Sequence, residues 1–416
     1  MRRVAACLLL VLGLCLAAAR APAAQASPGM RVGIDDDSFL YWMDPSLRYA
    51  LDLGVRIVRV NALWSPSRGS AYSLGGLRLT GALRQLADNA HGWNIQVVVS
   101  FYPARAVDAP QDDASRRQFC GAAAQLVQQQ PQIVAIVIGN EPNTARYWQP
   151  QYNADGSPAS PQSYFQTVAL CYDMLHAVDP GINVVGPATS DRGNDNPRAT
   201  SNVSISPGAF IAGLGRAYRA SGRTKPIFDT IDHHPYPLTA AERPWKQHAD
   251  TRVIGEGDLN RLVAAYQSAF AGTGQPAPGR CVAGRCIAVW YTEDGFQTRI
   301  DPSLARAYRN VETDKQAVAP DSPPETGPLP PAASRAPSQT QQLRDAISLA
   351  YCQPYVQAFF NFQLLDEASL AGWQSGLLYT NLTYKPSYPL FHDLTYDARA
   401  GKIDCSRYAP ALQGIG

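Results

Sequence analysis

The chain has 416 residues, of which 45% are hydrophobic and 17% are charged, and its formal net charge at pH 7 is +2. This nearly balanced charge excludes a protein that binds nucleic acid mainly by electrostatic attraction, because such proteins carry a marked excess of Lys and Arg. The length is compatible with two domains or with one α/β barrel that carries insertions.

Residues 1–26 are predicted to be an export signal. Arg2 and Arg3 begin it, residues 4–19 are nearly all apolar, and residues 24–26 (Ala-Gln-Ala) fit a small-x-small cleavage pattern. A retained membrane anchor is the weaker interpretation, because the apolar run is shorter than the roughly 20 residues that span a bilayer. Cleavage removes three of the 36 Lys and Arg and none of the 34 Asp and Glu, which leaves a net charge of −1. We therefore expect a secreted protein that begins at Ser27 and has no membrane partner.

Strand-like apolar runs then alternate with segments of helical spacing along the rest of the chain. The predicted strands are 30–35, 55–61, 95–101, 133–139, 182–187, 228–232, 287–292 and 356–362. The predicted helices are 46–53, 81–90, 114–129, 163–178, 208–220, 260–270, 340–351 and 387–394.

This alternation predicts an α/β fold, a (β/α)₈ TIM barrel formed by one domain over residues 27–416. An open, doubly wound sheet is the alternative. It is disfavoured because no Gly-rich phosphate loop follows the first predicted strand.

The long connections follow the fourth, fifth and seventh predicted strands, so they are expected on the C-terminal face of the barrel, where active sites lie. Residues 143–160 contain Tyr147, Trp148 and Tyr152 among Pro, Gly and Asn, which suggests a loop that presents aromatic rings to a ligand. Residues 318–338 are rich in Pro, Ala and Ser, and they are interpreted as a flexible flap or a partly disordered insertion.

Six cysteines follow the predicted signal, an even number that suits disulfides in an oxidising compartment. Cys281 and Cys286 lie close enough in sequence to staple one loop. The pairs Cys120 with Cys171 and Cys352 with Cys405 are a hypothesis from position alone. A zinc site is the less favoured alternative, because the sequence has no Cys-x-x-Cys pair and few histidines.

Two short motifs that contain a carboxylate each end an apolar strand. They are residues 138–142, Ile-Gly-Asn-Glu-Pro, and residues 290–296, Trp-Tyr-Thr-Glu-Asp-Gly-Phe. Cleavage of a glycosidic bond needs two carboxyl groups, one to protonate the leaving oxygen and one to attack or stabilise the anomeric carbon. Glu141 and Glu293 are the candidates for these catalytic roles.

With these motifs the chain resembles the clan-A retaining glycoside hydrolases, the superfamily of cellulase-type and β-xylosidase-type enzymes. The resemblance covers nearly the whole chain after residue 26. It implies that Asn140 and the acid/base Glu141 end the fourth strand and that the nucleophile Glu293 ends the seventh. Asp294 departs from the family pattern, because an aromatic or small residue often follows the nucleophile, and Asp294 could itself raise a neighbouring pKa.

The second predicted strand contains Arg59, for which the resemblance implies a stabilising contact with the nucleophile. A guanidinium can form a charge-assisted hydrogen bond with the carboxylate of Glu293. Strand alternation places Arg59 and Asn61 on one face and the adjacent valines on the other, so both are candidate substrate-binding residues. An arginine that pairs with a surface acid is the alternative for Arg59.

The sixth predicted strand ends in residues 232–236, Asp-His-His-Pro-Tyr. The resemblance implies an inward His and a Tyr that bonds the nucleophile. We predict that His234 is the inward histidine and that Tyr236 is the tyrosine bonded to the nucleophile. His233 is a candidate for a second layer of residues around the site. A metal site is the less favoured reading of the adjacent histidines, because neighbouring residues on a strand point in opposite directions; no metal and no cofactor are expected.

After the eighth strand, the resemblance implies that Trp373 forms the floor of the sugar site, where its ring would contact the C–H groups of a pyranose. A core residue that closes the barrel is the alternative. Residues 35–37, Asp-Asp-Asp, could accept bonds from sugar hydroxyls, bind calcium or form an acidic turn without a catalytic role.

The hypothesis is a monomeric, secreted, retaining glycosidase that acts on a carbohydrate substrate. A carbohydrate-binding barrel without turnover is the alternative from another class of protein. A hydrolase of unrelated chemistry is a third possibility, and against it the sequence lacks a Gly-x-Ser-x-Gly elbow.

Overall fold

The computed structural model describes residues 27–66, 79–311, 327–330 and 336–413. The predicted export signal, and all of the predicted insertion except 327–330 and 336–338, lie outside these residues. None of the helices in the described ranges is long and apolar enough to cross a membrane.

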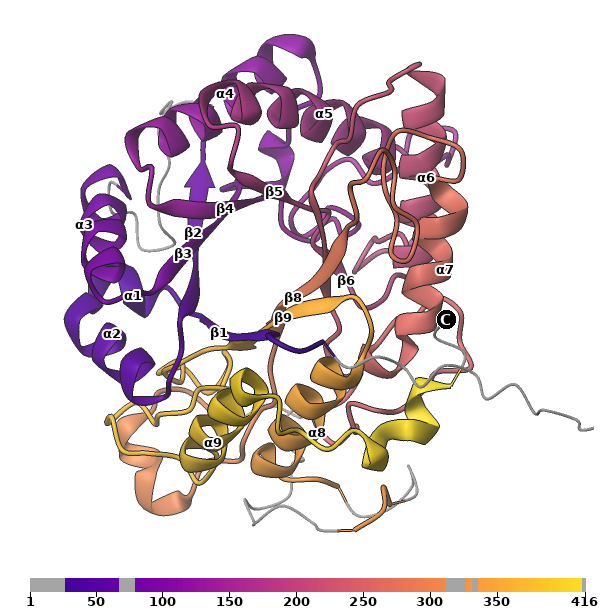
Figure 1. The fold of residues 1–416 in the computed structure, drawn as a ribbon. Helices are drawn as coiled ribbons and strands as arrows, with labels where there is room; N and C mark the ends of the chain where they lie inside the picture. The colour runs from indigo at the N-terminus through magenta and orange to yellow at the C-terminus, as the bar shows by residue number, and fades with distance from the viewer. Residues whose placement is uncertain (1–26, 67–78, 312–326, 331–335, 414–416) are drawn as a thin grey trace, which may run out of the picture.

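Nine parallel strands form a ring around one axis (Figure 1). Their order is β5-β4-β3-β2-β1-β9-β8-β7-β6, and the pairing of Val185 in β5 with Thr230 in β7 closes the ring. The strands are β1 Arg31–Asp35, β2 Ile57–Trp64, β3 Gln96–Pro103, β4 Ile133–Ile138, β5 Asn183–Val185, β6 Thr189–Ser190, β7 Thr230–His234, β8 Ala288–Asp294 and β9 Val356–Phe362.

The ring has eight positions, because β5, which lies within the predicted fifth strand, and β6, which follows its predicted end at residue 187, both pair with β7 and share one position. Gly186 and Pro187 lie between these two strands. Proline has no N–H to donate to a sheet, so the ladder is interrupted there. The predicted closed (β/α)₈ barrel is thus confirmed, and the open sheet is excluded.

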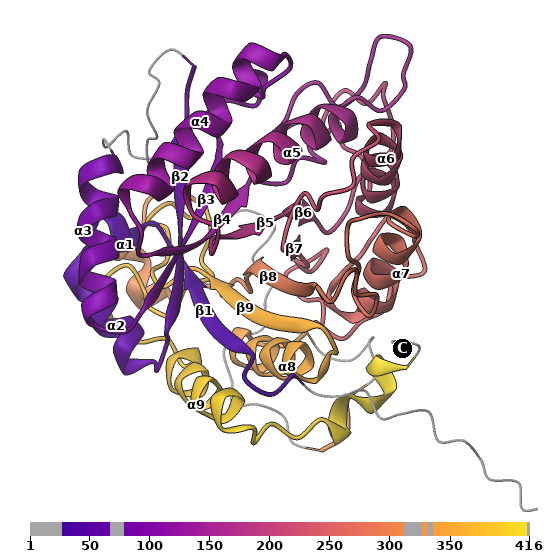
Figure 2. The same ribbon diagram turned by 45° about the horizontal axis from the view of Figure 1, so that its top comes forward.

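Helices surround the ring in chain order, as Figures 1 and 2 show. Two of their ends follow sequence signals: Asp112 and Ser115 form a capping box before α4, and Gly401, with φ +69°, ends α9. The helices are α1 Ser38–Tyr41, α2 Met43–Asp52, α3 Leu79–Gly92, α4 Asp113–Gln129, α5 Ser160–Val178, α6 Pro207–Ala220, α7 Leu259–Ala269, α8 Gln339–Cys352 and α9 Ser387–Ala400.

Part of the barrel interior is apolar. Ile57, Val98, Val137, Trp290 and Phe360 belong to one buried cluster to which six strands contribute. On β2, Val58 and Val60 belong instead to the larger core between strands and helices. The alternation predicted from the sequence is therefore correct, and it directs Arg59 into the barrel above Ile57.

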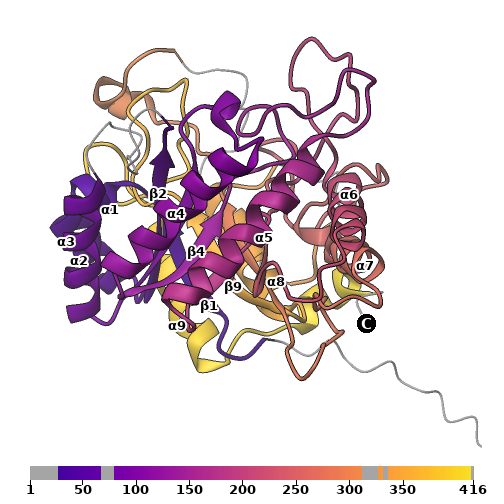
Figure 3. The same cartoon turned by 90° about the horizontal axis from the view of Figure 1, so that it is seen from above.

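The long connections after β4 and β6 gather at one end of the barrel, which Figure 3 shows from the side. The carboxyl ends of all parallel strands meet at this end. A site there can combine side chains from strands that are far apart in the sequence.

All three predicted cysteine pairs are disulfides. Cys120–Cys171 joins α4 to α5, Cys281–Cys286 closes a short loop before β8, and Cys352–Cys405 joins the end of α8 to the segment after α9. Each disulfide links residues that lie outside the hydrogen-bonded strands of the barrel.

The disulfides should differ in their contribution to stability, because the entropy lost by the unfolded chain grows with loop length. Replacing Cys120 and Cys171 by Ala, which opens a loop of 51 residues, is expected to lower the free energy of unfolding by about 4 kcal/mol. The same change at Cys281 and Cys286, 5 residues apart, should cost about 2 kcal/mol. Denaturant unfolding under non-reducing conditions measures both, and equal losses would contradict this account.

Candidate active site

Glu141 lies three residues beyond the end of β4. Gly139 has φ +83°, and Glu141 itself has φ +37°, a backbone conformation that residues with a side chain rarely adopt. A Cβ at position 139 would lie 3.0 Å from the ring of Tyr164. The Gly-Asn-Glu-Pro turn is therefore held in a strained shape, as is frequent at functional sites.

Glu293 is on β8, and both of its carboxylate oxygens accept hydrogen bonds. Oε1 lies 2.8 Å from Nη1 of Arg59, and Oε2 accepts from the hydroxyl of Tyr236 at 3.2 Å. Burial on its own would raise the pKa of this carboxyl group. The positive charges of His234 and Arg59 overcome that effect and hold the pKa below its usual value, so Glu293 is ionised at neutral pH.

Arg59 is fully buried and bonds to side chains from several strands. Nη1 also pairs with Asp35 of β1, which lies directly beside Arg59 in the sheet register. Nη2 donates to Ser100 of β3 at 2.9 Å and to Asn140 at 3.1 Å. Burial lowers the pKa of this guanidinium, but the charges of Asp35 and Glu293 raise it further, so Arg59 stays charged.

His234 lies between the two glutamates. Its Nδ1 is 3.4 Å from Oε1 of Glu141 and 3.6 Å from Oε2 of Glu293. Its Nε2 is 3.2 Å from the hydroxyl of Thr292, which in turn donates to Asp232 at 2.7 Å. Burial lowers the pKa of His234, but the surrounding negative charges outweigh it and raise the pKa to about 9. The imidazole is therefore protonated at neutral pH.

His233 points to the opposite side of β7, as predicted for adjacent residues on a strand. Its Nε2 is 2.7 Å from the carbonyl oxygen of Ile254, and its Nδ1 is 2.8 Å from the hydroxyl of Thr189. Burial lowers the pKa of His233 to about 4. This imidazole is neutral at pH 7, and its hydrogen bonds link β7 to the backbone of Ile254 and to the side chain of Thr189.

Glu141, His234 and Glu293 each offer one ligand atom within 4.8 Å of the others. Among the described residues they form the one such group of His, Cys, Asp or Glu, which makes them the place where a metal ion could bind. Arg59 and protonated His234 already give the carboxylates two positive charges, which disfavours a divalent cation there. The expected lack of a metal stays a prediction.

Aromatic rings line one side of this site. The ring centroid of Tyr236 is 5.2 Å from that of Trp373 and 6.1 Å from that of Phe362, and Trp373 is half-buried. Asn61 follows Arg59 on the inward face of β2, and its backbone N–H donates to Asp37 at 2.8 Å. The structure thus brings together seven of the predicted site residues: Glu141, Glu293, Arg59, Asn140, His234, Tyr236 and, through Tyr236, Trp373.

Trp148 does not join them, and its prediction as a substrate-binding residue is wrong. Its ring is fully buried against Tyr164, with centroids 5.5 Å apart, and its indole N–H donates to Ser163 at 2.9 Å. The loop composition indicated an exposed platform. The loop instead folds back onto α5 and buries its largest apolar side chain, which offers no surface to a ligand.

The acidic residues 35–37 have structural roles. Asp35 pairs with Arg59, Asp36 accepts the backbone N–H groups of Leu364 and Leu365, and Asp37 accepts that of Asn61. This is closest to the prediction of an acidic turn. Sequence reasoning missed the role of Asp35, although the alternation of β1 and its pairing with β2 could have placed it beside Arg59.

Three further polar residues of the site were missed. Ser100 interrupts the apolar strand β3, and Asp232 and Thr292 flank the predicted His234 and Glu293 in sequence. All three are buried within the barrel. A polar side chain at an inward position of an apolar strand was the available signal.

Asp294, which departs from the family pattern, is buried next to Glu293 in the sequence. Together with Tyr236 and Glu256 it lines a small enclosed cavity beside the site. Burial raises the pKa of both Asp294 and Glu256 well above the usual range of carboxyl groups. This shift favours the neutral form of both groups.

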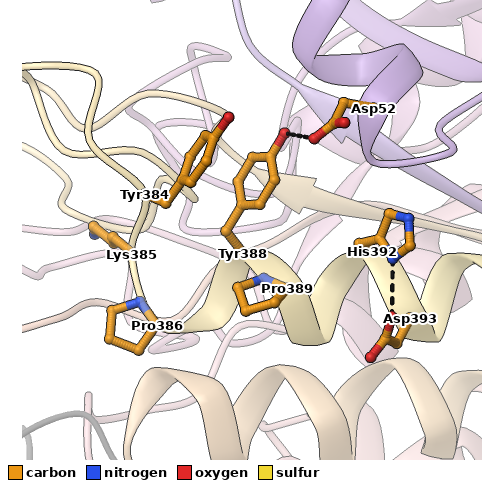
Figure 4. Close-up of a pocket in the computed structure, with 8 residues that line it drawn as sticks. All are labelled: Asp52, Tyr384, Lys385, Pro386, Tyr388, Pro389, His392 and Asp393. Carbon is orange, nitrogen blue, oxygen red and sulfur yellow. Dashed lines mark hydrogen bonds and ion pairs between the residues drawn. The ribbon is translucent and has the colours of Figure 1, made fainter.

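A separate hollow lies on the outer wall of the barrel, between α2 and α9 (Figure 4). The stacked rings of Tyr384 and Tyr388, with centroids 4.3 Å apart, line it, and the hydroxyl of Tyr388 donates to Asp52 at 2.7 Å. None of the predicted site residues lines this hollow. The carboxylate pair therefore belongs to the barrel mouth alone.

No protein-family model and no curated protein matches the sequence. Solved structures do. A family 39 glycoside hydrolase from Bacteroides cellulosilyticus WH2 is similar with a TM-score of 0.54 and 14% identity, over 90% of this chain and 65% of that one. This chain therefore spans less than two thirds of the length of the family 39 protein.

Two other structures are similar at comparable levels. A glucosidase from Croceicoccus marinus has a TM-score of 0.53 and 10% identity, over 90% of this chain and 68% of that one. The virulence factor SghA from Agrobacterium tumefaciens, solved with its substrate analog salicin, has a TM-score of 0.53 and 10% identity, over 88% of this chain and 96% of that one. The chain is thus structurally similar to TIM-barrel glycoside hydrolases, and at these identities the likeness concerns the fold.

The raised pKa of His234 makes a prediction about stability against pH. A histidine whose pKa is about 9 in the folded state and about 6.5 unfolded stabilises the fold fully below pH 6.5, and this stabilisation is lost as the pH rises through 9. The contribution is on the order of 3 kcal/mol. Denaturant unfolding of the wild type and His234→Asn from pH 6 to 10 measures it.

His248 has a pKa raised to about 9 as well, by its bonds to Asp258 and Glu242, so the wild-type profile contains both effects. The informative quantity is therefore the difference between the wild type and His234→Asn. That difference should shrink between pH 6.5 and 9. A constant difference over this range would show that His234 is not charged in the folded protein.

Proposed function

We propose that this protein is a secreted retaining glycoside hydrolase that cleaves O-glycosidic bonds of an oligosaccharide or polysaccharide by double displacement. The observation that carries the proposal is the closeness of Glu141 and Glu293: one carboxylate oxygen of each lies within 4.8 Å of the other, and His234 contacts both. Retaining enzymes hold their carboxyl groups about 5–5.5 Å apart, whereas inverting enzymes need roughly 6.5–9.5 Å to admit a water molecule.

In the first step, Glu293 attacks the anomeric carbon and Glu141 protonates the oxygen of the leaving group. The ionised state of Glu293 suits a nucleophile. Arg59 and Tyr236 each donate a hydrogen bond to one of its oxygens. The carboxylate is therefore already oriented before the reaction, and no further entropy is lost in orienting it. The bond to the leaving group breaks as the glycosyl–Glu293 ester forms.

In the second step, Glu141 takes a proton from water, and the resulting hydroxide oxygen displaces Glu293 from the anomeric carbon. The same group serves as acid and then as base, because the two steps are chemically the reverse of one another. His234, in contact with both carboxylates, holds a positive charge between them in the free enzyme. His234 loses this charge only if it gives a proton to Glu141 or to solvent.

Trp373 and Tyr236 supply the aromatic wall for a sugar ring. The faces of a pyranose carry C–H groups that pack on such rings, while the hydroxyls find polar partners such as Asn140 and Asn61. The proposed export agrees with the predicted leader at residues 1–26 and with the three disulfides. We expect the enzyme to act as a monomer and without a cofactor.

Replacement of the nucleophile gives the test. Glu293→Ala should lower kcat on an aryl glycoside substrate by a factor on the order of 10⁴, because the covalent step is lost. Sodium azide should restore part of the rate. Since azide enters from the face that Glu293 occupied, the product should be a glycosyl azide of inverted configuration, which proton NMR identifies.

Glu141→Ala should lose on the order of 10²- to 10⁴-fold with a poor leaving group and much less with an activated one, because only the poor leaving group needs a proton. Glu367→Ala, the same change at an exposed glutamate of the β9–α9 loop, is the control and should keep wild-type rates. Wild-type turnover by Glu293→Ala would refute the mechanism. No hydrolysis of any glycan or aryl glycoside by the wild type would favour a binding protein.

A further inference from the structure

The hollow between α2 and α9 lies on the outer wall of the barrel, and no residue of the carboxylate site lines it (Figure 4). Its volume is about 500 Å³, which is in the range of small-molecule sites. Pro386, the N-cap of α9, and Pro389 belong to its wall. Because the proline ring fixes the backbone dihedral φ, this part of the wall has its shape before any ligand arrives.

Aromatic rings form a stripe along α9 and the loop before it. Tyr388, His392 and Tyr396 follow one another at intervals of four residues, so they lie on one face of the helix. Tyr384 stacks on Tyr388, with ring centroids 4.3 Å apart, and the centroid of His392 is 4.7 Å from that of Tyr396. A helix rises about 12 Å over eight residues, so the stripe is long enough for more than one ring of a ligand.

The two ends of this stripe are open to solvent. Tyr384 is 59% exposed and Tyr396 is 43% exposed. The guanidinium of Arg399 lies 5.3 Å from the ring centroid of Tyr396, which leaves Tyr384 as the more accessible ring. Behind Tyr384, the buried ring of Tyr388 is held by the bond from its hydroxyl to Asp52 at 2.7 Å. Tyr384 therefore offers a flat apolar face that stacking has already restricted, which lowers the entropy lost on binding.

Acidic side chains supply the polar part of the hollow. Oδ2 of Asp52 accepts from Tyr388, and Oδ1 of Asp393 is 2.9 Å from Nδ1 of His392. Within the part of the chain that the structure describes, the second oxygen of each carboxylate makes no hydrogen bond. Both residues are exposed, so these two oxygens are accessible to a ligand.

Lys385 also belongs to the lining, but its charge is turned into the protein. Its Nζ is buried, and it donates to the hydroxyl of Thr298, the carboxylate of Asp366 and the carbonyl oxygen of Gln374. The hollow therefore combines an apolar ring face with negatively charged acceptors. A neutral sugar ring matches both, because its C–H groups pack on aromatic rings and its hydroxyls donate hydrogen bonds. A sugar acid would be repelled by the carboxylates.

We propose that this hollow and the aromatic stripe bind a segment of a neutral glycan chain outside the barrel mouth. One sugar ring packs on Tyr384, and its hydroxyls donate to Asp52 and Asp393. The length of the stripe favours a chain over a single sugar or a small organic cation. The choice of a glycan as ligand rests on the proposed function. In a hydrolase of polysaccharides, such a site keeps the enzyme on its polymer and raises the local concentration of bonds to cleave.

Affinity electrophoresis tests the binding without any need for turnover. Glu293→Gln, with and without Tyr384→Ala, is run through native gels that contain xylan, mixed-linkage β-glucan or galactomannan, and polygalacturonate is the acidic comparison. At least one neutral polysaccharide should retard Glu293→Gln, and Tyr384→Ala should raise that dissociation constant about fivefold, the loss of one stacked ring. Equal retardation of both proteins, retardation by polygalacturonate alone, or retardation by none of the polysaccharides would overturn the proposal.

Two further variants in the Glu293→Gln background separate stacking from a change in the fold. Tyr384→Phe keeps the ring and should retain the affinity within about twofold. Val178→Ala, which shortens an exposed apolar side chain at the end of α5, is the control and should bind as Glu293→Gln does. A loss of affinity in Tyr384→Phe or Val178→Ala equal to that in Tyr384→Ala would contradict a stacked sugar at this position.

Turnover gives an independent measurement in the otherwise unchanged enzyme. Tyr384→Ala should lower the rate on dilute polysaccharide about fivefold more than the rate on an aryl glycoside, because only the polymer reaches both sites at once. An equal fall on both substrates would contradict a separate site for the polymer. If the wild type hydrolyses neither substrate, the proposed function fails, while the electrophoresis still decides whether this site binds a glycan.

Discussion

The candidate active site depends on one buried guanidinium. Arg59 is inaccessible to solvent, and it contacts the carboxylates of Asp35 and Glu293, the hydroxyl of Ser100 and the amide of Asn140. Removing a charge of this kind from water costs several kcal/mol, which is offset only when its partners are well placed. Here the partners come from β1, β3, β8 and the turn after β4, so the closed barrel must form before the charge is satisfied. The fold and the site are therefore coupled through one side chain.

Around Arg59, the environment gives each ionisable group a different state. Glu293 contacts two positive charges, which lower its pKa, while burial raises the pKa of Asp294, its neighbour on the strand, well above the usual range. His234 and His233 differ in the same way, since one faces carboxylates and the other faces a hydroxyl and a backbone carbonyl. Because adjacent residues of a strand point in opposite directions, one strand can hold a charged group beside a neutral group of the same type.

The sequence predicted those features that depend on local pattern. Apolar runs located the strands to within a few residues, and alternation correctly placed Arg59 on the face of β2 opposite to the adjacent valines. Features that depend on contacts distant in sequence were missed or wrong. Trp148 was assigned to a ligand because its loop looked exposed, but packing on α5 buries it. The ion pair between Asp35 and Arg59 was missed because it depends on the register of β1 on β2. The break in the strand at Gly186 and Pro187 was missed because the predicted strand included both residues.

The central claim is that Glu293 forms a covalent bond to the sugar. An activated glycoside with fluorine at C2 tests this most directly. The fluorine slows both formation and breakdown of the glycosyl-enzyme, and the good leaving group restores the rate of formation alone, so the intermediate accumulates. After incubation, proteolysis and mass spectrometry should find one sugar on the peptide that contains Glu293, and no label in Glu293→Gln. A label on another residue, or hydrolysis of the parent glycoside with inversion at the anomeric carbon, would contradict the account.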